Sequence, residues 1–385
     1  LSGPPAYVCT EVFGLTASSA AWMVSGLLAE DHPPVAILLA DQAAAQRFYQ
    51  ALAFYHRRPE EVCFFPHWEV EPYAPLSPHP EIEATRMASL AALTAGRVRA
   101  LVTTVPALMQ RVVPQEILRT LHLQLTVGRE YPYQALLQRL TALGYSRVPL
   151  VEDRGTCAVR GDLIDLYPPA SEQPLRLVFF GDQLEEIRPF DATSQRSGEQ
   201  RLSHLELVPA REMVLAGEHL TTFCTRIKER CDDLELPRSQ REALLDEVRE
   251  GLLAPGREGL LALNYPALES LFDYLGKVRW LLFDPPGIAN AADEFAERVG
   301  AGERRLQEQG EPFVPAADFY LAPDQLEASL RRSRRIELND VQIYRLEQEH
   351  PVYRVPTLGN ADLRGSGLAV LFEQLRRWSE EQWRV

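Results

Sequence analysis

The chain has 385 residues, a length that favours two or more domains over a single core. Its composition, 46% hydrophobic and 24% charged, is that of a globular protein, and no apolar run approaches the ~20 residues that span a bilayer. A net charge of -14 opposes a surface that tracks a nucleic-acid backbone, because each phosphate contact needs a local cation. The start of the chain lacks both Met and signal-peptide features, so we expect a cytoplasmic fragment without membrane contact.

Cysteine and histidine positions follow no metal-site pattern. The five cysteines are widely spaced without a C-x-x-C pair and are expected to be small buried hydrophobic residues: Cys9, Cys63, Cys157, Cys224 and Cys231. Four other potential ligands lie close in sequence, without H-E-x-x-H spacing: His67, His79, Glu81 and Glu83. We therefore predict that the chain has no metal site.

The first third of the chain alternates apolar strands with helices. Strands are predicted at residues 35–40 and 100–105, and helices at 42–54 and 82–93. Continuous apolar strands that alternate with helices indicate a parallel sheet covered on both faces. The fold class predicted for this part is α/β.

From about residue 115 the pattern changes to short strands joined by tight turns. A helix predicted at 133–143 precedes four strands, at 156–160, 163–167, 175–180 and 184–188. Two-residue turns such as Gly181-Asp182 join antiparallel neighbours. This segment is therefore predicted to be an α+β domain inserted into the α/β domain.

Past residue 209 the helical pattern returns. The predicted elements are helices at 220–231, 239–253, 292–309, 325–335 and 368–378, with strands at 278–283 and from 383. The arginines within 331–335 are interpreted as helix-end cations. The predicted division is 1–116 and 209–345 for the α/β domain, 117–208 for the inserted domain, and 346–385 for a linker and the start of a further, truncated domain.

Residues 14–21 occupy the place of a phosphate-binding loop. That loop has the pattern G-x-x-x-x-G-K-[ST], in which glycines admit phosphate to backbone N–H groups, Lys neutralises charge and the hydroxyl binds magnesium. The stretch begins Gly14, Leu15, Thr16, Ala17, but the second Gly, the Lys and the Ser/Thr are replaced by Ser19, Ala20 and Ala21. No lysine precedes Lys228, so no residue of this region supplies the missing charge. The residues leave open that Thr16 or Ser18 simply caps an ordinary helix.

Longer stretches carry a family resemblance. The residues at 160–168 (RGDLIDLYP), 176–182 (RLVFFGD) and 188–191 (RPFD) closely resemble the inserted domain of the excinuclease UvrB. Those at 68–75 (WEVEPYAP) and 80–86 (PEIEATR) resemble the N-terminal module of the bacterial transcription-repair coupling factor, a family itself similar to UvrB. The resemblance covers about residues 8–345. It implies a helicase-type, P-loop NTPase-like sheet domain that carries an inserted α+β domain.

Departures from UvrB indicate that its chemistry is lost. Only four residues separate Pro75 from Pro80, which leaves no room for the long hairpin that UvrB inserts into damaged DNA. The strand that ends at Asp284 continues into Pro285, where an ATPase of this type has Glu, and proline cannot act as a general base. Together with the phosphate loop, these departures predict a degenerate nucleotide site, no catalytic residue, and neither ATP nor magnesium bound by this chain.

Strand alternation gives the inserted domain two unlike faces. Leu175, Leu177 and Phe179 share one face and are expected to pack on the helix at 133–143. Arg176 and Phe180 point to the other face, where Arg160 of a neighbouring strand is expected beside Arg176. An exposed aromatic residue flanked by arginines on an open sheet is typical of an interface. Incidental surface arginines on an amphipathic sheet are the alternative that composition leaves open.

The family resemblance assigns partners to this surface and to the parent protein. It implies that Arg160, Arg176 and Phe180, called the docking surface here, contact the excinuclease UvrA. It also implies that the parent recognises RNA polymerase stalled at a DNA lesion and releases it by ATP-driven translocation on DNA, with ATP and magnesium in later motor domains. An intramolecular contact with the motor end that masks the docking surface is implied as well.

Two other functions remain open from the sequence. One is an ATP-dependent repair helicase of the UvrB type with an unusual phosphate loop. The other is a single-stranded DNA-binding module that uses Trp68 and Tyr73 as stacking platforms. Saturable ATP binding distinguishes the first, and salt-dependent retention of single-stranded DNA distinguishes the second.

Overall fold

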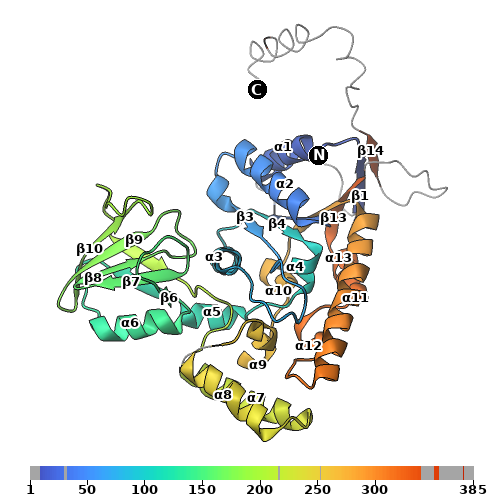
Figure 1. Ribbon diagram of the computed structural model, residues 1–385. Coiled ribbons are helices and arrows are strands. Elements are labelled where there is room, and N and C mark those ends of the chain that lie inside the picture. The colour runs from blue at the N-terminus through green and yellow to red at the C-terminus, as the bar shows by residue number, and fades with distance from the viewer. Residues whose placement is uncertain are drawn as a thin grey trace.

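A parallel sheet forms the centre of the larger part of the protein, called the body here (Figure 1). The computed structural model describes residues 9–29, 33–215, 217–251, 253–339, 351–354 and 376. Within these ranges the sheet has the order β14-β1-β13-β12-β2-β4-β3, with strands β1 (Cys9–Phe13), β2 (Val35–Leu39), β3 (Val62–Phe65), β4 (Ala100–Thr104), β12 (Arg279–Phe283), β13 (Arg334–Asn339) and β14 (Val352–Arg354). Every pair is parallel, so the carboxyl ends share one edge, where ligands bind in open α/β sheets.

Helices cover both faces of this sheet, as its apolar strands require. Alternate residues of β2 enter two different core clusters. One face packs on α1 (Ala17–Ala29) and α2 (Gln42–Tyr55). The other cluster includes residues of α3 (Pro80–Thr94), α4 (Val105–Met109), α5 (Gln115–Leu121), α7 (Gly217–Asp233), α8 (Arg238–Glu250), α9 (Leu261–Asn264), α10 (Leu271–Leu275), α11 (Pro285–Gln309), α12 (Ala316–Phe319) and α13 (Pro323–Arg332). Two short 3-10 turns, η1 (Pro59–Glu61) and η2 (Arg257–Leu260), complete the body.

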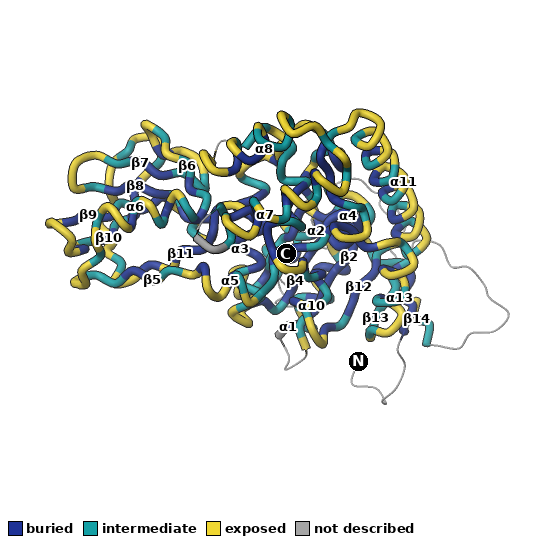
Figure 2. The backbone as a smooth tube through the Cα atoms, turned by 90° about the horizontal axis from the view of Figure 1, so that it is seen from below, coloured by how far each residue is buried: buried dark blue, intermediate teal, exposed yellow. Residues whose placement is uncertain are grey.

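The inserted domain projects from the body beside α3 and has a core of its own (Figures 1 and 2). Its elements are β5 (Leu123–Thr126), α6 (Tyr133–Ala142), β6 (Ser146–Arg147), β7 (Thr156–Arg160), β8 (Leu163–Leu166), β9 (Leu175–Phe180), β10 (Gln183–Pro189) and β11 (His204–Leu207). Strands β10-β9-β8-β7-β6 form a five-stranded sheet, and β11 pairs with β5. Leu136 and Leu140 of α6 pack with the buried residues of β9, so the packing predicted between them is confirmed.

A groove of about 1140 Å³ lies between α3 and the inserted domain, and ion pairs in and near α3 join the two parts. The fully buried guanidinium of Arg86 lies 2.6 Å from the carboxylate of Glu212, on the segment that leaves the inserted domain. Trp68 Nε1 donates to the same carboxylate at 2.9 Å. Two further pairs are less buried: Arg154 with Glu81 at 2.9 Å, and Arg97 with Glu206 at 3.3 Å. The buried pair is therefore the strongest candidate for fixing the orientation of the inserted domain.

The largest correction to the predicted elements concerns residues 325–335. The helix ends at Arg332, and Arg334–Asn339 form β13 in the middle of the sheet, between β1 and β12. Only Ile336 and Leu338 of this strand contact the core on the α1 side. The prediction extended the helix through the arginine-rich run, although Arg335 to Asn339 alternate polar and apolar residues. Helix α11 also begins earlier than predicted, at Pro285.

The predicted architecture, an α/β domain with a parallel sheet and an inserted α+β domain, is confirmed. The helix predicted at 368–378 and the strand predicted from 383 lie outside the described residues, apart from Arg376, which is helical. None of the described helices combines the length and the apolar character that crossing a membrane requires.

Candidate functional site

The stretch at the place of a phosphate-binding loop forms a capped helix start. Gly14 leaves β1 with a φ of 84°, and α1 begins at Ala17. The Thr16 N–H donates to Ser19 Oγ at 2.8 Å, and the Ser19 N–H donates to Thr16 Oγ1 at 3.3 Å. The two hydroxyls lie 3.0 Å apart. These reciprocal bonds make Thr16 the cap of the helix and pair its hydroxyl with that of Ser19.

Core residues fill the two positions that correspond to the Lys and the Ser/Thr of the loop. Ala20 and Ala21 are both 0% exposed and pack with Val24 and Leu28 of α1 and with residues of β2. A lysine at position 20 would start inside a packed interior, where an unpaired charge is strongly disfavoured. The structure therefore places both alanines in the hydrophobic core.

Asp284 lies at the same edge of the sheet, where it starts a helix. Its backbone is in the left-handed region with a φ of 53°, and its N–H donates to Leu338 O at 2.9 Å. Pro285 is the first residue of α11. A Cβ on Gly287 would lie 2.3 Å from Asp284 Oδ2, so the carboxylate rests against the first turn of α11 at a place that only glycine leaves open.

The segment between β3 and α3, residues 66–79, buries both aromatic residues of the single-stranded DNA alternative. Trp68 and Tyr73 are 8% and 7% exposed. The Trp68 indole bonds to Glu212, and the Tyr73 hydroxyl donates to Val314 O at 2.8 Å. Rings held in this way are not available as stacking platforms for bases, which argues against that alternative.

Close backbone packing fixes this connecting segment. A Cβ on Gly256 would lie 2.4 Å from Ala74 O, and one on Gly302 would lie 2.5 Å from Pro72 O. Arg305 donates to Tyr73 O at 2.8 Å. The segment then leads directly into α3, whose N-cap is His79, and it contains no hairpin.

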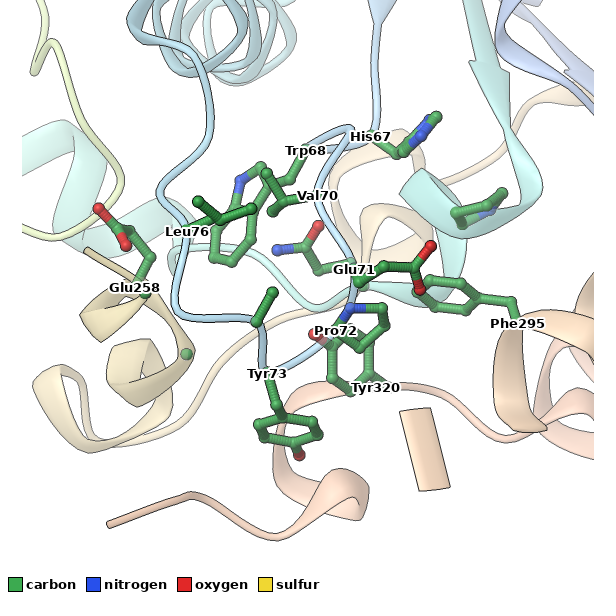
Figure 3. Close-up of a pocket in the computed structure, with 15 residues that line it drawn as sticks. His67, Trp68, Val70, Glu71, Pro72, Tyr73, Leu76, Glu258, Phe295 and Tyr320 are labelled. Carbon is green, nitrogen blue, oxygen red and sulfur yellow. The ribbon is translucent and has the colours of Figure 1, made fainter. Parts of the chain in front are cut away.

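A small cavity of about 30 Å³ lies beneath the connecting segment (Figure 3). Among the described residues, two buried atoms of its lining residues have no hydrogen-bond partner: Gln110 Nε2 and Glu258 Oε2. A water molecule needs about 10–15 Å³ of such space. The cavity therefore suits one or two water molecules and is too small for a nucleotide.

The side chains considered as metal ligands have other roles. His67 Nδ1 is 3.0 Å from Gln42 Oε1, and the His79 ring accepts a bond from the Glu81 N–H at 3.2 Å. Burial lowers the pKa of His67 and raises the pKa of Glu83 to about 8. Among the residues that the structure describes, no group of three His, Cys, Asp or Glu side chains could hold a metal ion.

None of the five cysteines forms a disulfide. Cys9, Cys157 and Cys231 are buried as predicted, whereas Cys63 and Cys224 are half-buried. Burial raises the pKa of Cys63 to about 11, which disfavours the thiolate that a nucleophile or metal ligand needs.

The two faces of the inserted domain's sheet differ as strand alternation predicts. Leu175, Leu177 and Phe179 of β9 are 3%, 0% and 3% exposed on the face toward α6. The ring of Tyr133 lies edge-on to that of Phe179, with centroids 5.3 Å apart. Phe180, the next residue, is 75% exposed. It lies on the opposite face, called the outer face here.

The two arginines of the docking surface have different surroundings. Arg160 is exposed, and its Nη2 donates to Pro149 O at 3.1 Å. Arg176 is half-buried, and its Nε and Nη2 donate to the two carboxylate oxygens of Asp165 at 2.7 and 2.9 Å. Asp165 is 2% exposed and lies directly opposite Arg176 in the β8–β9 register. The hydrogen bond to Asp165 raises the pKa of Arg176.

Two loop segments cover part of the outer face, which corrects the expectation of an open sheet with two free arginines. Ala158, Val151 and Phe190 are buried together on this face. Arg176 Nη1 donates to Ser197 Oγ at 3.0 Å, and its guanidinium lies 5.0 Å from the centroid of the Phe190 ring. The loop contributions were missed because both segments are irregular. The run from Arg160 to Asp165 (RGDLID) could have identified Asp165. It forms one hairpin, in which Arg160 pairs with Leu163 and alternation puts Asp165 on the same face as Leu163.

Comparisons with known proteins agree with this architecture. Residues 123–213 match the UvrB interaction domain family. The chain is 31% identical over 370 residues to the transcription-repair-coupling factor of Myxococcus xanthus, covering 90% of this chain and 30% of that protein. It is 29% identical over 326 residues to the corresponding factor of Escherichia coli K12, covering 84% of this chain and 28% of that protein. UvrABC system protein B of Geobacillus kaustophilus is 28% identical over 236 residues, or 58% of this chain and 35% of that protein.

The similarity to coupling factors extends over both the body and the inserted domain. The chain spans about 30% of the length of the Myxococcus xanthus relative. The chain is homologous to the N-terminal region of the transcription-repair-coupling factors, and its residues 123–213 form a UvrB interaction domain.

Proposed function

We propose that this chain recruits the excinuclease UvrA, and with it nucleotide excision repair, to RNA polymerase stalled at DNA lesions. The observation that carries the proposal is Phe180, which is 75% exposed on the outer face of a UvrB interaction domain. Arg160 is exposed on the same face. Aromatic and arginine side chains dominate the binding energy of most protein interfaces, and a rigid strand presents them at low entropic cost.

Arg176 belongs to the same proposal in a different role. Its paired hydrogen bonds to Asp165 and its bond to Ser197 fix the outer face beside Phe180. In this proposal Arg160 and Phe180 supply exposed contact area, while Arg176 supplies both contact and positioning. Charge-assisted, two-point bonds of this kind set geometry as well as energy.

In this proposal the parent protein displaces the stalled polymerase by ATP-dependent translocation on DNA. Other domains of the parent bind ATP, magnesium, DNA and RNA polymerase, and the present chain adds the docking step in the cytoplasm without catalytic residues of its own. The buried Ala20 and Ala21 and the helix start at Pro285 support the assignment of nucleotide chemistry to other domains. We also propose that contact with the motor end of the parent masks the docking surface.

Binding of the 385-residue chain to purified UvrA, measured by biolayer interferometry, tests the proposal. We expect saturable binding by the wild type and an affinity loss of about 30-fold in Phe180→Ala, as for a typical hot spot. The matched control is Phe54→Ala, because Phe54 is 77% exposed on α2 of the body. Its affinity is expected to equal that of the wild type.

A charge reversal completes the test. Arg176→Glu is unsuitable because it places a carboxylate against the buried Asp165, so a loss of binding would not be separable from a loss of structure. Arg160→Glu is preferable, since Arg160 is exposed. A wild-type chain that does not bind UvrA contradicts the proposal. So does wild-type affinity in both Phe180→Ala and Arg160→Glu.

A further inference from the structure

Exposed large apolar side chains in the inserted domain occur on one face. Among the described residues the structure leaves six such side chains exposed, and two of these are in the inserted domain: Leu150 at 38% and Phe180 at 75%. Phe180 is on the outer face of the sheet. The location of Leu150, which the sequence did not single out, follows from the contacts of its neighbours.

Both neighbours of Leu150 are attached to the outer face. Val151 is fully buried with Ala158 and Phe190 on that face, and its carbonyl accepts a bond from Gln195 Nε2 at 3.1 Å. Pro149 O accepts the bond from Arg160. Leu150 lies between these two attachments and still exposes its side chain. Little conformational entropy is therefore lost when a partner covers it.

A hydrogen bond and the strand register connect the Leu150 segment to Phe180: Arg160 donates to Pro149 O and begins a row of paired residues. Arg160 of β7 lies opposite Leu163 of β8, which lies opposite Val178 of β9. Residues that pair directly share a face, so all three are on the outer face. Leu163 and Val178 are half-buried, and Phe180 follows on the same face of β9. We call Leu150, Leu163, Val178 and Phe180 the apolar strip, and Arg160 borders it.

We propose that Leu150 is a second apolar anchor of the docking surface, so that UvrA covers the apolar strip and places a carboxylate against Arg160. This inference rests on the proposed function and adds to it the residue at the opposite end of the strip and the chemistry of the partner. Rigid, exposed apolar area next to a charged side chain is typical of a protein-protein interface. Arg160 forms no ion pair among the described residues, which leaves guanidinium donors for a carboxylate of the partner.

The apolar part is tested with the 385-residue chain and purified UvrA. Leu150→Ala is expected to weaken binding about 10-fold, and Leu150→Met is expected to bind nearly as well as the wild type. Leu76→Ala is the matched control, because Leu76 is 61% exposed on the body. Its affinity is expected to be unchanged. Circular dichroism and the thermal midpoint of each variant verify that the fold is retained.

The outcomes separate this inference from the proposed function. If Phe180→Ala weakens binding while Leu150→Ala binds like the wild type, the proposed role of Leu150 as an anchor is wrong and the proposed function stands. If the wild-type chain does not bind UvrA, both are wrong. For the carboxylate, Arg160→Gln is expected to reduce the salt dependence of binding. A salt dependence equal to that of the wild type contradicts this part.

Discussion

The carboxyl edge of the body sheet and the outer face of the inserted domain differ in how their side chains are satisfied. At the edge, Thr16 and Ser19 bond to each other, and Asp284 rests on the start of α11. On the outer face, Arg160 and Phe180 extend toward solvent. The polar side chains at this edge therefore bond within the chain itself, beside the buried Ala20 and Ala21. A docking surface, by contrast, requires apolar area that folding leaves uncovered.

Arg86 connects the two regions, and its removal is expected to have the largest effect. Arg86→Ala leaves the buried carboxylate of Glu212 unpaired and removes a guanidinium that lies 4.3 Å from the centroid of the Phe65 ring. We expect the free energy of unfolding, measured by urea titration at pH 7, to fall by about 3–5 kcal/mol. The control is Arg97→Ala, whose pair with Glu206 is exposed and is expected to contribute less than about 1 kcal/mol. Equal losses in both variants would show that the buried pair has no special role.

A lysine at position 20 tests whether the carboxyl edge of the body sheet can bind a nucleotide. Ala20→Lys is expected to lower the free energy of unfolding by about 2–3 kcal/mol, because the new side chain starts inside the core. No saturable binding of a fluorescent ATP analogue is expected in either the wild type or this variant. Ala17→Lys, at an exposed position of the same helix, is expected to stay within about 0.5 kcal/mol of the wild type. Micromolar ATP binding by a stable Ala20→Lys chain would show that residues 14–21 can still bind phosphate.

The two arginines of the outer face are expected to differ in stability. Arg176→Ala leaves the buried Asp165 carboxylate without its main partner, and we expect a loss of about 1–3 kcal/mol. Arg160→Ala removes a bond to one exposed carbonyl and is expected to cost less than about 0.5 kcal/mol. Chemical denaturation followed by tryptophan fluorescence measures both. Matching losses would mean that the contacts of Arg176 do not organise this face.

A change in the pH dependence of stability is expected at the junction. Burial raises the pKa of Glu83 from its ordinary 4.5 to about 8, with Arg211, Glu258, Glu212 and Arg86 as its charged neighbours. Between these two values the folded state keeps a proton that the unfolded state has released, so this contribution to stability is lost as the pH rises toward 8. Glu83→Gln removes the contribution.

Unfolding midpoints in urea from pH 5 to pH 8 provide the measurement. The stability of the wild type relative to Glu83→Gln is expected to fall steadily across this range. Parallel stability curves for the two proteins would indicate that Glu83 ionises in the folded state at its ordinary pKa.

Local sequence patterns identified most of the elements that position the site. The strand at β9 and the helix at α2 follow from their own alternation and periodicity, because each signal lies within one short window. The strand β13 was assigned in part to the preceding helix because of the arginine-rich run at 331–335, although Arg335 to Asn339 alternate polar and apolar residues. Its place between β1 and β12 depends on segments more than 50 residues apart along the chain.

The sequence by itself determined that residues 14–21 lack the lysine of a phosphate loop, that an α+β domain is inserted in an α/β domain, and that Arg176 and Phe180 share one face of their strand. Composition and period-two alternation are local properties and need no partner segment. Tertiary structure alone decided that Ala20 is buried, that Asp165 pairs with Arg176, and that Leu150 joins the outer face. These facts depend on strand register and on loops that pack across it, since burial and ion pairing are set by residues distant in sequence.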